Sequence, residues 1–387
     1  MGVIKMASYS KYEDKKGNEF YKVQFYLGRD PQTGKSKTTT LRGFRTKKQA
    51  SNAMIAAKND FINGKQKKPK NRTFKDVYVD WYESYKLTVQ ESTIARTKGI
   101  FNNHILKAFG DKRINTITVA DVQKAINLWY KHTERNYKKW FNYTSLVFKY
   151  AVKTRLITEN PCSLVTIPKM KRTYGKKLEN FWSIDQLNQF MNCIDPDKEL
   201  EKYTLFRVLA YSGMRRGELL ALTWQDISFK DSSIDINKTV AQGLRGKQII
   251  QPTKTKAGRR TITMDDTTML YLKRWRLSQK QMYMMYGFNT MNKSQLVFAN
   301  SKNKLKSLNT PLKWLNAIIK QNGLSKITVH GFRHTHASIL ASNGVPVKQV
   351  QDRLGHDDVK TTLQVYTHVS ESDRRKTVQI FNDAMKN

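Results

Sequence analysis

The sequence predicts a multidomain α+β protein, from its length, its two hydrophobic periodicities and its basic linkers. A chain of 387 residues can form two or three domains, each with a hydrophobic core. Near the N-terminus apolar and polar residues alternate, as in strands, and farther along apolar residues mostly recur every three or four positions, as in helices. Basic stretches at 64–72 and 167–177 separate these regions. We therefore expect domains at residues 1–66, 67–168 and 169–387.

The first domain is predicted to be a small three-stranded sheet followed by one helix. Residues 20–27 alternate, with Val23 and Phe25 on one face, and residues 35–41 can form the next strand. A helix is expected from Thr46 onward. Basic side chains on the sheet would be placed to grip a nucleic-acid groove and backbone, and a solvated basic face is the alternative. They are Lys22, Arg29, Lys35, Lys37 and Arg42.

The second domain is predicted to be a helical bundle, with helices over 73–85, 92–109, 118–130 and 137–154. Apolar stripes along these helices are expected to form its core. Basic residues on the bundle and in the linker that follows it are candidate phosphate contacts. Among them are Lys138, Lys139, Lys171 and Arg172.

The third domain is predicted to be mostly helical with a small antiparallel sheet, and a capping box at Ser183 begins it. The expected helices cover 203–211, 215–222, a long segment from Asp265, 310–323, 332–341, 347–354 and 359–366. The expected strands are 233–236, 247–250, 260–264 and 296–299. A turn at 253–258 contains Lys254 and joins two of these strands.

The composition indicates a polyanionic partner. Lys and Arg number 70 against 31 Asp and Glu, a formal net charge of +39. A membrane-surface protein or a ribosome-like binder would explain the charge equally well. Cys162 and Cys193 are too few for a disulfide framework, and no apolar run resembles a signal peptide or a transmembrane segment. We expect a soluble cytoplasmic protein with no membrane partner.

Residues 328–369 concentrate side chains that suit phosphate chemistry. The guanidinium of Arg333 can bind phosphate oxygens by two hydrogen bonds. His330 and His356 can donate hydrogen bonds or move protons near neutral pH. Tyr366 is a competent nucleophile once its proton is removed. These groups could together transfer a phosphoryl group of a diester.

The sequence resembles the tyrosine recombinases, the phage integrase family. The resemblance rests on His330-x-x-Arg333-His334, Leu354-Gly355-His356, Tyr366-Thr-His-Val, the segment from Ser212 through Arg215 and Glu218 to Trp224, and Pro252-Thr-Lys254-Thr-Lys256. It extends from about Glu179 to the C-terminus, and more weakly over the upstream regions. It implies an arm-type DNA-binding domain at 1–66, a helical core-binding domain at 67–168 and a catalytic domain at 169–387.

The resemblance assigns roles to the candidate residues. Tyr366 would attack a DNA phosphate and form a 3′-phosphotyrosyl bond. Arg215 and Arg333 would hold the phosphate, with His356 as a further donor. His330 would accept the tyrosine proton or donate another hydrogen bond.

A lysine of the 253–258 turn would protonate the leaving 5′ oxygen. Lys254 is the candidate, and Lys256 is the alternative. Glu218 could fix Arg215 by an ion pair, unless that pair is merely exposed and weak. His330, His334, His336 and His356 have no carboxylate or cysteine at ligand spacing, so no metal site is expected.

The resemblance also implies partners. They are double-stranded DNA at core and arm sites, a homotetramer that forms a Holliday junction, and, as possibilities, an excisionase and a host DNA-bending protein. No cofactor is expected, because one diester is exchanged for another. The mobile element could be a temperate phage or an integrative conjugative element. The alternatives are a non-catalytic DNA-binding protein on the same fold, a chromosome-dimer resolvase and a type IB topoisomerase. The apolar residues of 371–385 would pack in cis or dock on a neighbouring protomer.

Overall fold

The computed structural model describes residues 7–14, 17–29, 35–62, 72–133, 135–169 and 180–366, together with 382 and 385. Contacts between these residues divide the chain into two units. One combines Met1–Trp81 with Ile105–Pro168, and the other combines Tyr82–His104 with Lys169–Asn387. The division into three domains stays a prediction.

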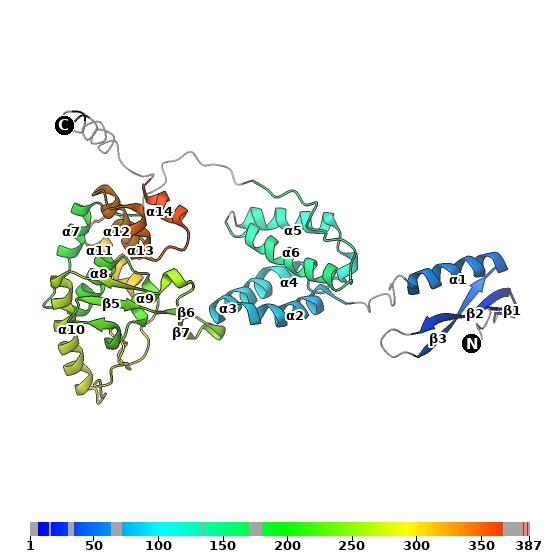
Figure 1. The fold of residues 1–387 in the computed structure, drawn as a ribbon, viewed down its shortest axis with the longest axis horizontal. Coiled ribbons are helices and arrows are strands. Elements are labelled where there is room, and N and C mark those ends of the chain that lie inside the picture. Colours follow the sequence, from blue (N-terminus) through cyan, green and yellow to red (C-terminus); the bar gives the residue numbers. More distant parts are fainter. Residues whose placement is uncertain are drawn as a thin grey trace. The chain divides into compact units, whose positions relative to one another are not determined.

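The N-terminal region is an antiparallel sheet of three strands in the order β1-β2-β3, followed by one helix (Figure 1). The elements are β1 (Ser8–Glu13), β2 (Glu19–Arg29), β3 (Ser36–Phe44) and α1 (Lys47–Ile62). Val23 and Phe25 of β2 are buried together with Ala50 of α1. The alternation seen in the sequence therefore does place one face of the sheet against the helix.

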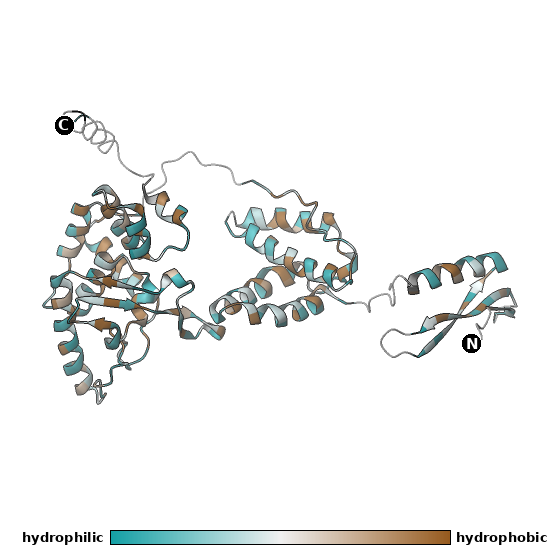
Figure 2. Cartoon of the chain, viewed as in Figure 1, coloured by the Kyte–Doolittle hydropathy of each residue, from teal (hydrophilic) through white to brown (hydrophobic). Residues whose placement is uncertain are grey.

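The next region is helical, as expected. Its helices are α2 (Phe74–Tyr85), α3 (Glu91–Ile100), α4 (Leu106–Phe109), α5 (Val119–His132) and α6 (Tyr137–Lys153). A π-helical turn, Phe101–Ile105, lies within the helix expected at 92–109. The core is aromatic: the ring centroids of Phe74 and Phe148 are 5.3 Å apart, and those of Trp129 and Trp140 are 5.8 Å apart. Figure 2 shows hydrophobic and hydrophilic residues interspersed along these helices, which is the pattern of helices with one buried face.

The C-terminal region is mostly helical with small antiparallel sheets, which confirms the predicted fold class. Its helices are α7 (Ile184–Asn192), α8 (Leu200–Ser212), α9 (Arg216–Ala221), α10 (Asp266–Met285), α11 (Thr310–Gln321), α12 (Gly331–Ser342), α13 (Val347–Leu354) and α14 (Val359–Tyr366). Its strands are β4 (Ile227–Ser228), β5 (Ser233–Ile236), β6 (Lys238–Gln242), β7 (Gln248–Pro252) and β8 (Arg260–Thr263).

The strands of this region pair differently from their order in the sequence. β4, β5 and β8 form one sheet, and β6 and β7 form a separate hairpin, so β7 and β8 on either side of the lysine turn are not partners. The strand expected at 296–299 is wrong. Leu296 and Ala299 make only isolated bridges, to Thr223 and Leu305. Val297 and Phe298 are fully buried, so the apolar run is a core-lining loop.

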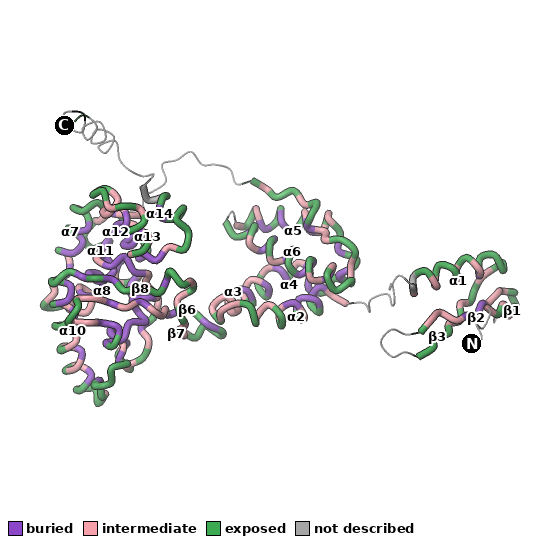
Figure 3. The backbone as a smooth tube through the Cα atoms, viewed as in Figure 1, coloured by how far each residue is buried: buried purple, intermediate pink, exposed green. Residues whose placement is uncertain are grey.

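A cluster of aromatic side chains lies beneath α12. The rings of Phe206 and Phe332 stack with centroids 5.5 Å apart, and Trp182 and Phe190 also pack on this cluster. Figure 3 shows buried residues concentrated along α8 and α12 and in the small sheet. This core holds the N-terminal turn of α12, which carries Arg333, in a fixed place. None of the described helices is both long and apolar enough to cross a membrane.

Candidate active site

Arg215 follows a sharp chain reversal between α8 and α9. α8 ends at Gly213, whose φ of 64° is left-handed and therefore favours glycine. A Cβ at Gly213 would lie 2.7 Å from a methyl carbon of Leu354 and 2.8 Å from a ring carbon of His336. The absence of a side chain thus lets the end of α8 approach α12 and α13. Arg215 then caps α9 in an extended conformation.

Glu218 holds two arginines in place. Its carboxylate accepts a hydrogen bond from Nη1 of Arg215 at 2.7 Å, from the Arg215 backbone N–H at 2.9 Å and from Nη2 of Arg260 at 3.0 Å. The Glu218 side chain is only 3% exposed, so the alternative of a weak surface ion pair does not apply. Burial alone would raise the pKa of Glu218, but Arg260 and Arg215 outweigh it and lower that pKa.

Arg333 is a buried cation with a free hydrogen-bond donor. Its residue surface is 2% exposed, and Nη1 donates to the carbonyl of Gly213 at 3.0 Å. Nη2 is buried and has no hydrogen-bond partner among the described residues. Burial, followed by repulsion from Arg215 and Arg260, lowers the pKa of Arg333 to about 9. We name Arg215, Arg260 and Arg333 the arginine cluster. It carries more positive charge than Glu218 neutralises, so it suits an anionic ligand.

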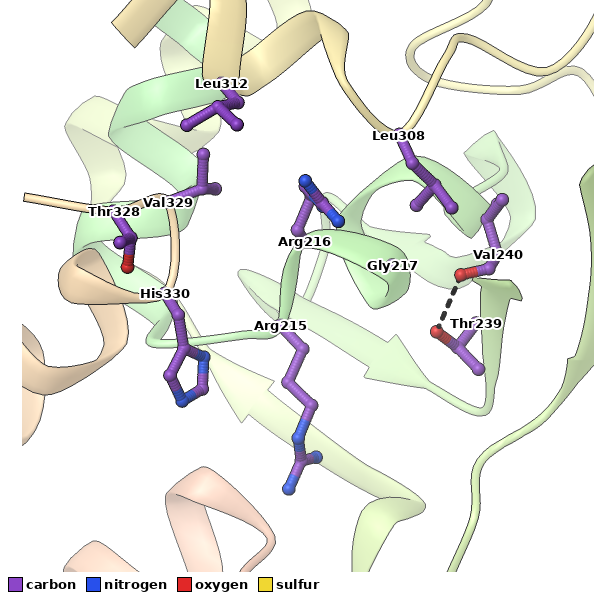
Figure 4. A pocket seen from close by; sticks show the side chains of 10 residues that line it. All are labelled: Arg215, Arg216, Gly217, Thr239, Val240, Leu308, Leu312, Thr328, Val329 and His330. Atoms are coloured by element: carbon purple, nitrogen blue, oxygen red, sulfur yellow. Dashed lines mark hydrogen bonds between the residues drawn. The ribbon is translucent and has the colours of Figure 1, made fainter. Parts of the chain in front are cut away.

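His330 stands beside this cluster. It caps α12 and lines a cavity of about 450 Å³ together with Arg215. Figure 4 shows the side chains of Arg215 and His330 pointing to the same side, while Arg216 points the opposite way. Partial desolvation, then the neighbouring His334 and Arg333, lower the pKa of His330 to about 4. The ring is therefore neutral near pH 7 and can accept a proton.

His356 approaches the cluster from the loop after α13. That helix ends at Gly355, whose φ is 68°, and the Gly355 carbonyl accepts a hydrogen bond from Nη2 of Arg215 at 3.4 Å. Nδ1 of His356 hydrogen-bonds with the hydroxyl of Thr362 at 2.9 Å, which leaves Nε2 to meet a ligand. Burial, then Arg333 and Arg215, lower the pKa of His356 to about 3. The ring is neutral without substrate, and a bound phosphate would favour its protonated form.

Tyr366 is the last residue of α14, and only its backbone is described. α14 packs against α12 and α13, which carry Arg333 and precede His356. Tyr366 therefore ends a helix that packs on α12 and α13, the two helices next to the arginine cluster. Expectations about the segment 371–385 fall almost entirely outside the described residues.

The lysine turn meets the arginine cluster only at its end among the described residues, where Nη1 of Arg260 donates to the Gly258 carbonyl at 3.0 Å. Lys254 lies two residues beyond the end of β7 and lines a cavity of about 930 Å³ that shares no lining residue with the Arg215 cavity. Lys256 begins a short 3-10 turn, Lys256–Gly258. Both lysines are exposed. The structure does not choose between them.

The remaining candidates are surface positions. On the N-terminal sheet Arg29, Lys35 and Arg42 are exposed, and Lys22 and Lys37 are half-buried. Lys138 is exposed and Lys139 half-buried in the first turn of α6. Lys171 and Arg172 lie outside the described residues. Their contacts with DNA stay predictions. Within the described ranges no group of three His, Cys, Asp or Glu residues could hold a metal ion.

Sequence reasoning missed the side chains that brace the site. Arg260 donates from Nε to the Arg353 carbonyl at 2.8 Å and from Nη1 to the Gly258 carbonyl at 3.0 Å. Arg353 donates from Nε to Nε2 of His336 at 3.0 Å, and Nδ1 of His336 meets the carbonyl of Ala210 at 2.9 Å. His336 is therefore neutral with its proton on Nδ1. An arginine at the start of a short strand gives no sequence signal that separates a buried brace from an exposed charge.

Comparisons with known proteins agree with this fold. Residues 180–373 match the model of the phage integrase family, residues 73–130 match its N-terminal SAM-like domain, and residues 9–61 match an arm DNA-binding domain. A site that concentrates buried arginines and neutral histidines beside α12 and α13 suits a phosphodiester ligand. The chain belongs to the phage integrase family, the tyrosine recombinases.

The relatives extend along nearly the whole chain. The ICEBs1 integrase of Bacillus subtilis is 25% identical over 95% of this chain and 98% of its own length. The integrase of Staphylococcus phage L54a is 28% identical over 80% of this chain and 92% of its own length. Among solved structures, the Tn1549 transposon integrase with circular intermediate DNA has a TM-score of 0.63 at 18% identity, covering 80% of this chain and 99% of that one. A lambda integrase tetramer bound to a Holliday junction has a TM-score of 0.53 at 17% identity, covering 90% and 95%. The structures show that the fold is shared.

Proposed function

We propose that this protein is a site-specific DNA recombinase that integrates and excises a mobile element, either a temperate phage or an integrative conjugative element. The observation that carries the proposal is the buried Nη2 donor of Arg333, which has no partner among the described residues. Burying a hydrogen-bond donor without a partner costs free energy. A substrate oxygen that accepts a hydrogen bond from Nη2 would explain why Arg333 is buried in this way. The scissile phosphate of DNA provides such an oxygen.

The first step transfers the phosphate from DNA to the protein. The phenolic oxygen of Tyr366 attacks phosphorus, a bond to the 3′ phosphate forms, and the bond to the 5′ oxygen breaks. Arg215 and Arg333 stabilise the charge that develops on the non-bridging oxygens, with His356 as a further donor. Glu218 keeps the Arg215 guanidinium at a fixed angle for this purpose.

Two protons move in this step. The tyrosine proton passes to His330, whose lowered pKa keeps it in the accepting form, or His330 instead donates to the phosphate. The 5′ oxygen takes a proton from Lys254, with Lys256 as the alternative. A 5′ hydroxyl from another strand then reverses the step, so bond energy is conserved. Exchange of two strands gives a Holliday junction within a homotetramer.

The proposed partners follow from the family and the charge. The arm DNA-binding region would hold arm sites, and the helical and catalytic regions would hold core sites of double-stranded DNA. A net charge of +39 supports a DNA partner. An excisionase and a host DNA-bending protein would set the direction of recombination, in the cytoplasm of a bacterial host. A chromosome-dimer resolvase is disfavoured because such a protein has no need of the N-terminal sheet.

Covalent trapping tests the proposal. A core-site duplex selected by binding from a random pool is nicked near the crossover, so that the cleaved 5′ fragment diffuses away. The wild-type protein should form an adduct that survives denaturant, and Tyr366→Phe should form none while binding the same DNA. Specific binding by wild-type protein with no adduct would instead indicate a non-catalytic DNA-binding protein. Relaxation of plasmids without any site preference would indicate a topoisomerase.

A further inference from the structure

The β6–β7 hairpin, which leads into the lysine turn, is anchored on the first turn of α3. Both belong to the contact unit that combines Tyr82–His104 with Lys169–Asn387. Nε2 of Gln251 donates to Oε1 of Gln90 at 2.8 Å and to the hydroxyl of Ser92 at 3.0 Å. At the other end of the hairpin, Oε1 of Glu91 accepts from the backbone N–H of Leu244 at 3.2 Å. We name these contacts the hairpin anchor.

The hairpin is built to admit the Glu91 carboxylate. A Cβ at Gly243 would lie 2.6 Å from Oε1 of Glu91, which is closer than real contacts allow, and 3.1 Å from two side-chain carbons of Ile249. The φ of −90° is open to any residue, so what a larger side chain here would disturb is the Glu91 carboxylate. The chain therefore leaves room on the hairpin for a side chain that comes from α3.

Gln251 also shows a feature that stability alone does not explain. Its Oε1 is buried and accepts no hydrogen bond from any residue that the structure describes. A buried acceptor without a donor destabilises a fold. The two bonds that Nε2 of Gln251 donates to α3 fix the position of the hairpin, whatever they add to stability.

The location of Lys254 depends on where the hairpin anchor holds β7. It follows Gln251 by three residues, and both line the cavity of about 930 Å³ with Arg96 and Lys98 of α3. The far end of the turn that carries Lys254 is held by Nη1 of Arg260, which donates to the Gly258 carbonyl at 3.0 Å, and the hairpin anchor holds the end next to Lys254. A displacement of about 1 Å at a reacting group can reduce a rate by about 100-fold.

We propose that Gln251 and Glu91 are positioning residues, which hold the β6–β7 hairpin on α3 so that Lys254 meets the leaving oxygen. The inference rests on the proposed function. In cleavage the phosphorus leaves the 5′ oxygen for the oxygen of Tyr366, and that 5′ oxygen takes one proton from the Lys254 ammonium. If sulfur replaces the bridging 5′ oxygen, a thiolate leaves without needing that proton. A variant that slows cleavage only by misplacing Lys254 should therefore regain the wild-type rate on the sulfur substrate.

The experiment uses the full-length protein and the nicked core-site DNA, with oxygen or sulfur at the 5′ bridging position. Gln251→Ala should slow adduct formation about tenfold on the oxygen substrate and leave the sulfur substrate within about twofold of wild type. Glu91→Ala should behave alike, and Glu91→Gln, which keeps an acceptor oxygen, should restore most of the rate. The control is Gln248→Ala, which removes a hydrogen bond from the same strand to the Lys306 carbonyl at 3.0 Å, and should match wild type on both substrates.

Two results would overturn the inference. Equal slowing by Gln251→Ala on both substrates would show that the anchor serves folding or DNA binding only, and an unchanged oxygen rate would show that it has no role. In the double variant Gln251→Ala with Lys254→Ala, the oxygen rate should be no lower than in Lys254→Ala alone. Failure of the proposed function has a different signature, because wild-type protein would then form no adduct on either substrate.

Discussion

The arginine cluster and the lysine turn are both assigned to one reaction, yet they are built in opposite ways. Glu218, 3% exposed, fixes Arg215 and Arg260, and Arg333 is buried against a backbone carbonyl. Lys254 and Lys256 are exposed on a turn between strands that belong to different sheets. Groups that stabilise charge must be oriented before the substrate arrives. A proton donor can be delivered by a movable element, provided that something else sets its position.

The largest effect should come from Arg333→Met. Loss of the buried guanidinium should slow adduct formation about 1,000-fold. The free energy of unfolding should stay the same or rise by about 1–2 kcal/mol, because an uncompensated buried cation is removed. Adduct assays and urea unfolding measure the two effects. Arg42→Met, at an exposed position of β3, is the matched control and should change neither on core-site DNA. A large loss of stability in Arg333→Met would mean that the cation is structural.

Glu218→Gln should have the largest effect on stability. It removes the negative charge that two buried or half-buried arginines share, so the free energy of unfolding should fall by about 3–5 kcal/mol. Adduct formation should fall as well, because Arg215 loses its fixed angle. The control is Asp352→Asn, which removes the charge of an exposed ion pair whose Lys348 Nζ and Asp352 Oδ1 are 2.8 Å apart. It should lower the free energy of unfolding by less than about 1 kcal/mol. Equal costs at the two sites would contradict the preorganised cluster.

The lysine turn should respond in the reverse manner. Lys254→Ala should slow cleavage about 100-fold on the oxygen substrate and leave both the sulfur substrate and the stability near wild type. Lys256→Ala is the companion variant, since the two lysines are alternatives. Sulfur rescue of Lys256→Ala alone would identify Lys256 as the acid. If the sulfur substrate restores the rate of neither variant, the lysine turn does not supply the proton.

Acid should destabilise the region that surrounds the cluster. Burial, then Arg353, lower the pKa of His336 to about 4 in the folded protein. The unfolded chain binds this proton at a higher pH, near the ordinary value of about 6.5, so stability is lost as the pH falls from about 6.5 to 4. His336 should contribute about 3 kcal/mol to this loss. Urea unfolding at several pH values should therefore show a smaller decline for His336→Gln than for wild type. His132→Gln, at an exposed position of α5, should decline as wild type does.

The sequence predicted the elements of the catalytic region far better than their contacts. Helices α13 and α14 match their predicted ranges, and Gly355 marks the end of α13. Arg215, His330 and Arg333 could be chosen from motifs, and the structure places them near one another. The partner of β7 could not be predicted, because alternation shows that a strand exists but not which strand it pairs with. Arg260 could not be predicted either, since its role depends on Glu218, 42 residues away.

The smallest effects should come from the exposed basic residues of the N-terminal sheet. Unlike Arg260 and Arg333 of the arginine cluster, these side chains are not buried. Arg29→Ala and Arg42→Ala should each weaken binding to arm-site DNA and reduce the slope of log K against log salt by about 0.9. Losses from separate phosphate contacts should add, because exposed charges act independently, unlike the arginines that share Glu218. Titrations at several salt concentrations measure the slope. An unchanged slope would identify these side chains as a solvated basic face and would move the arm contacts to other residues of the sheet.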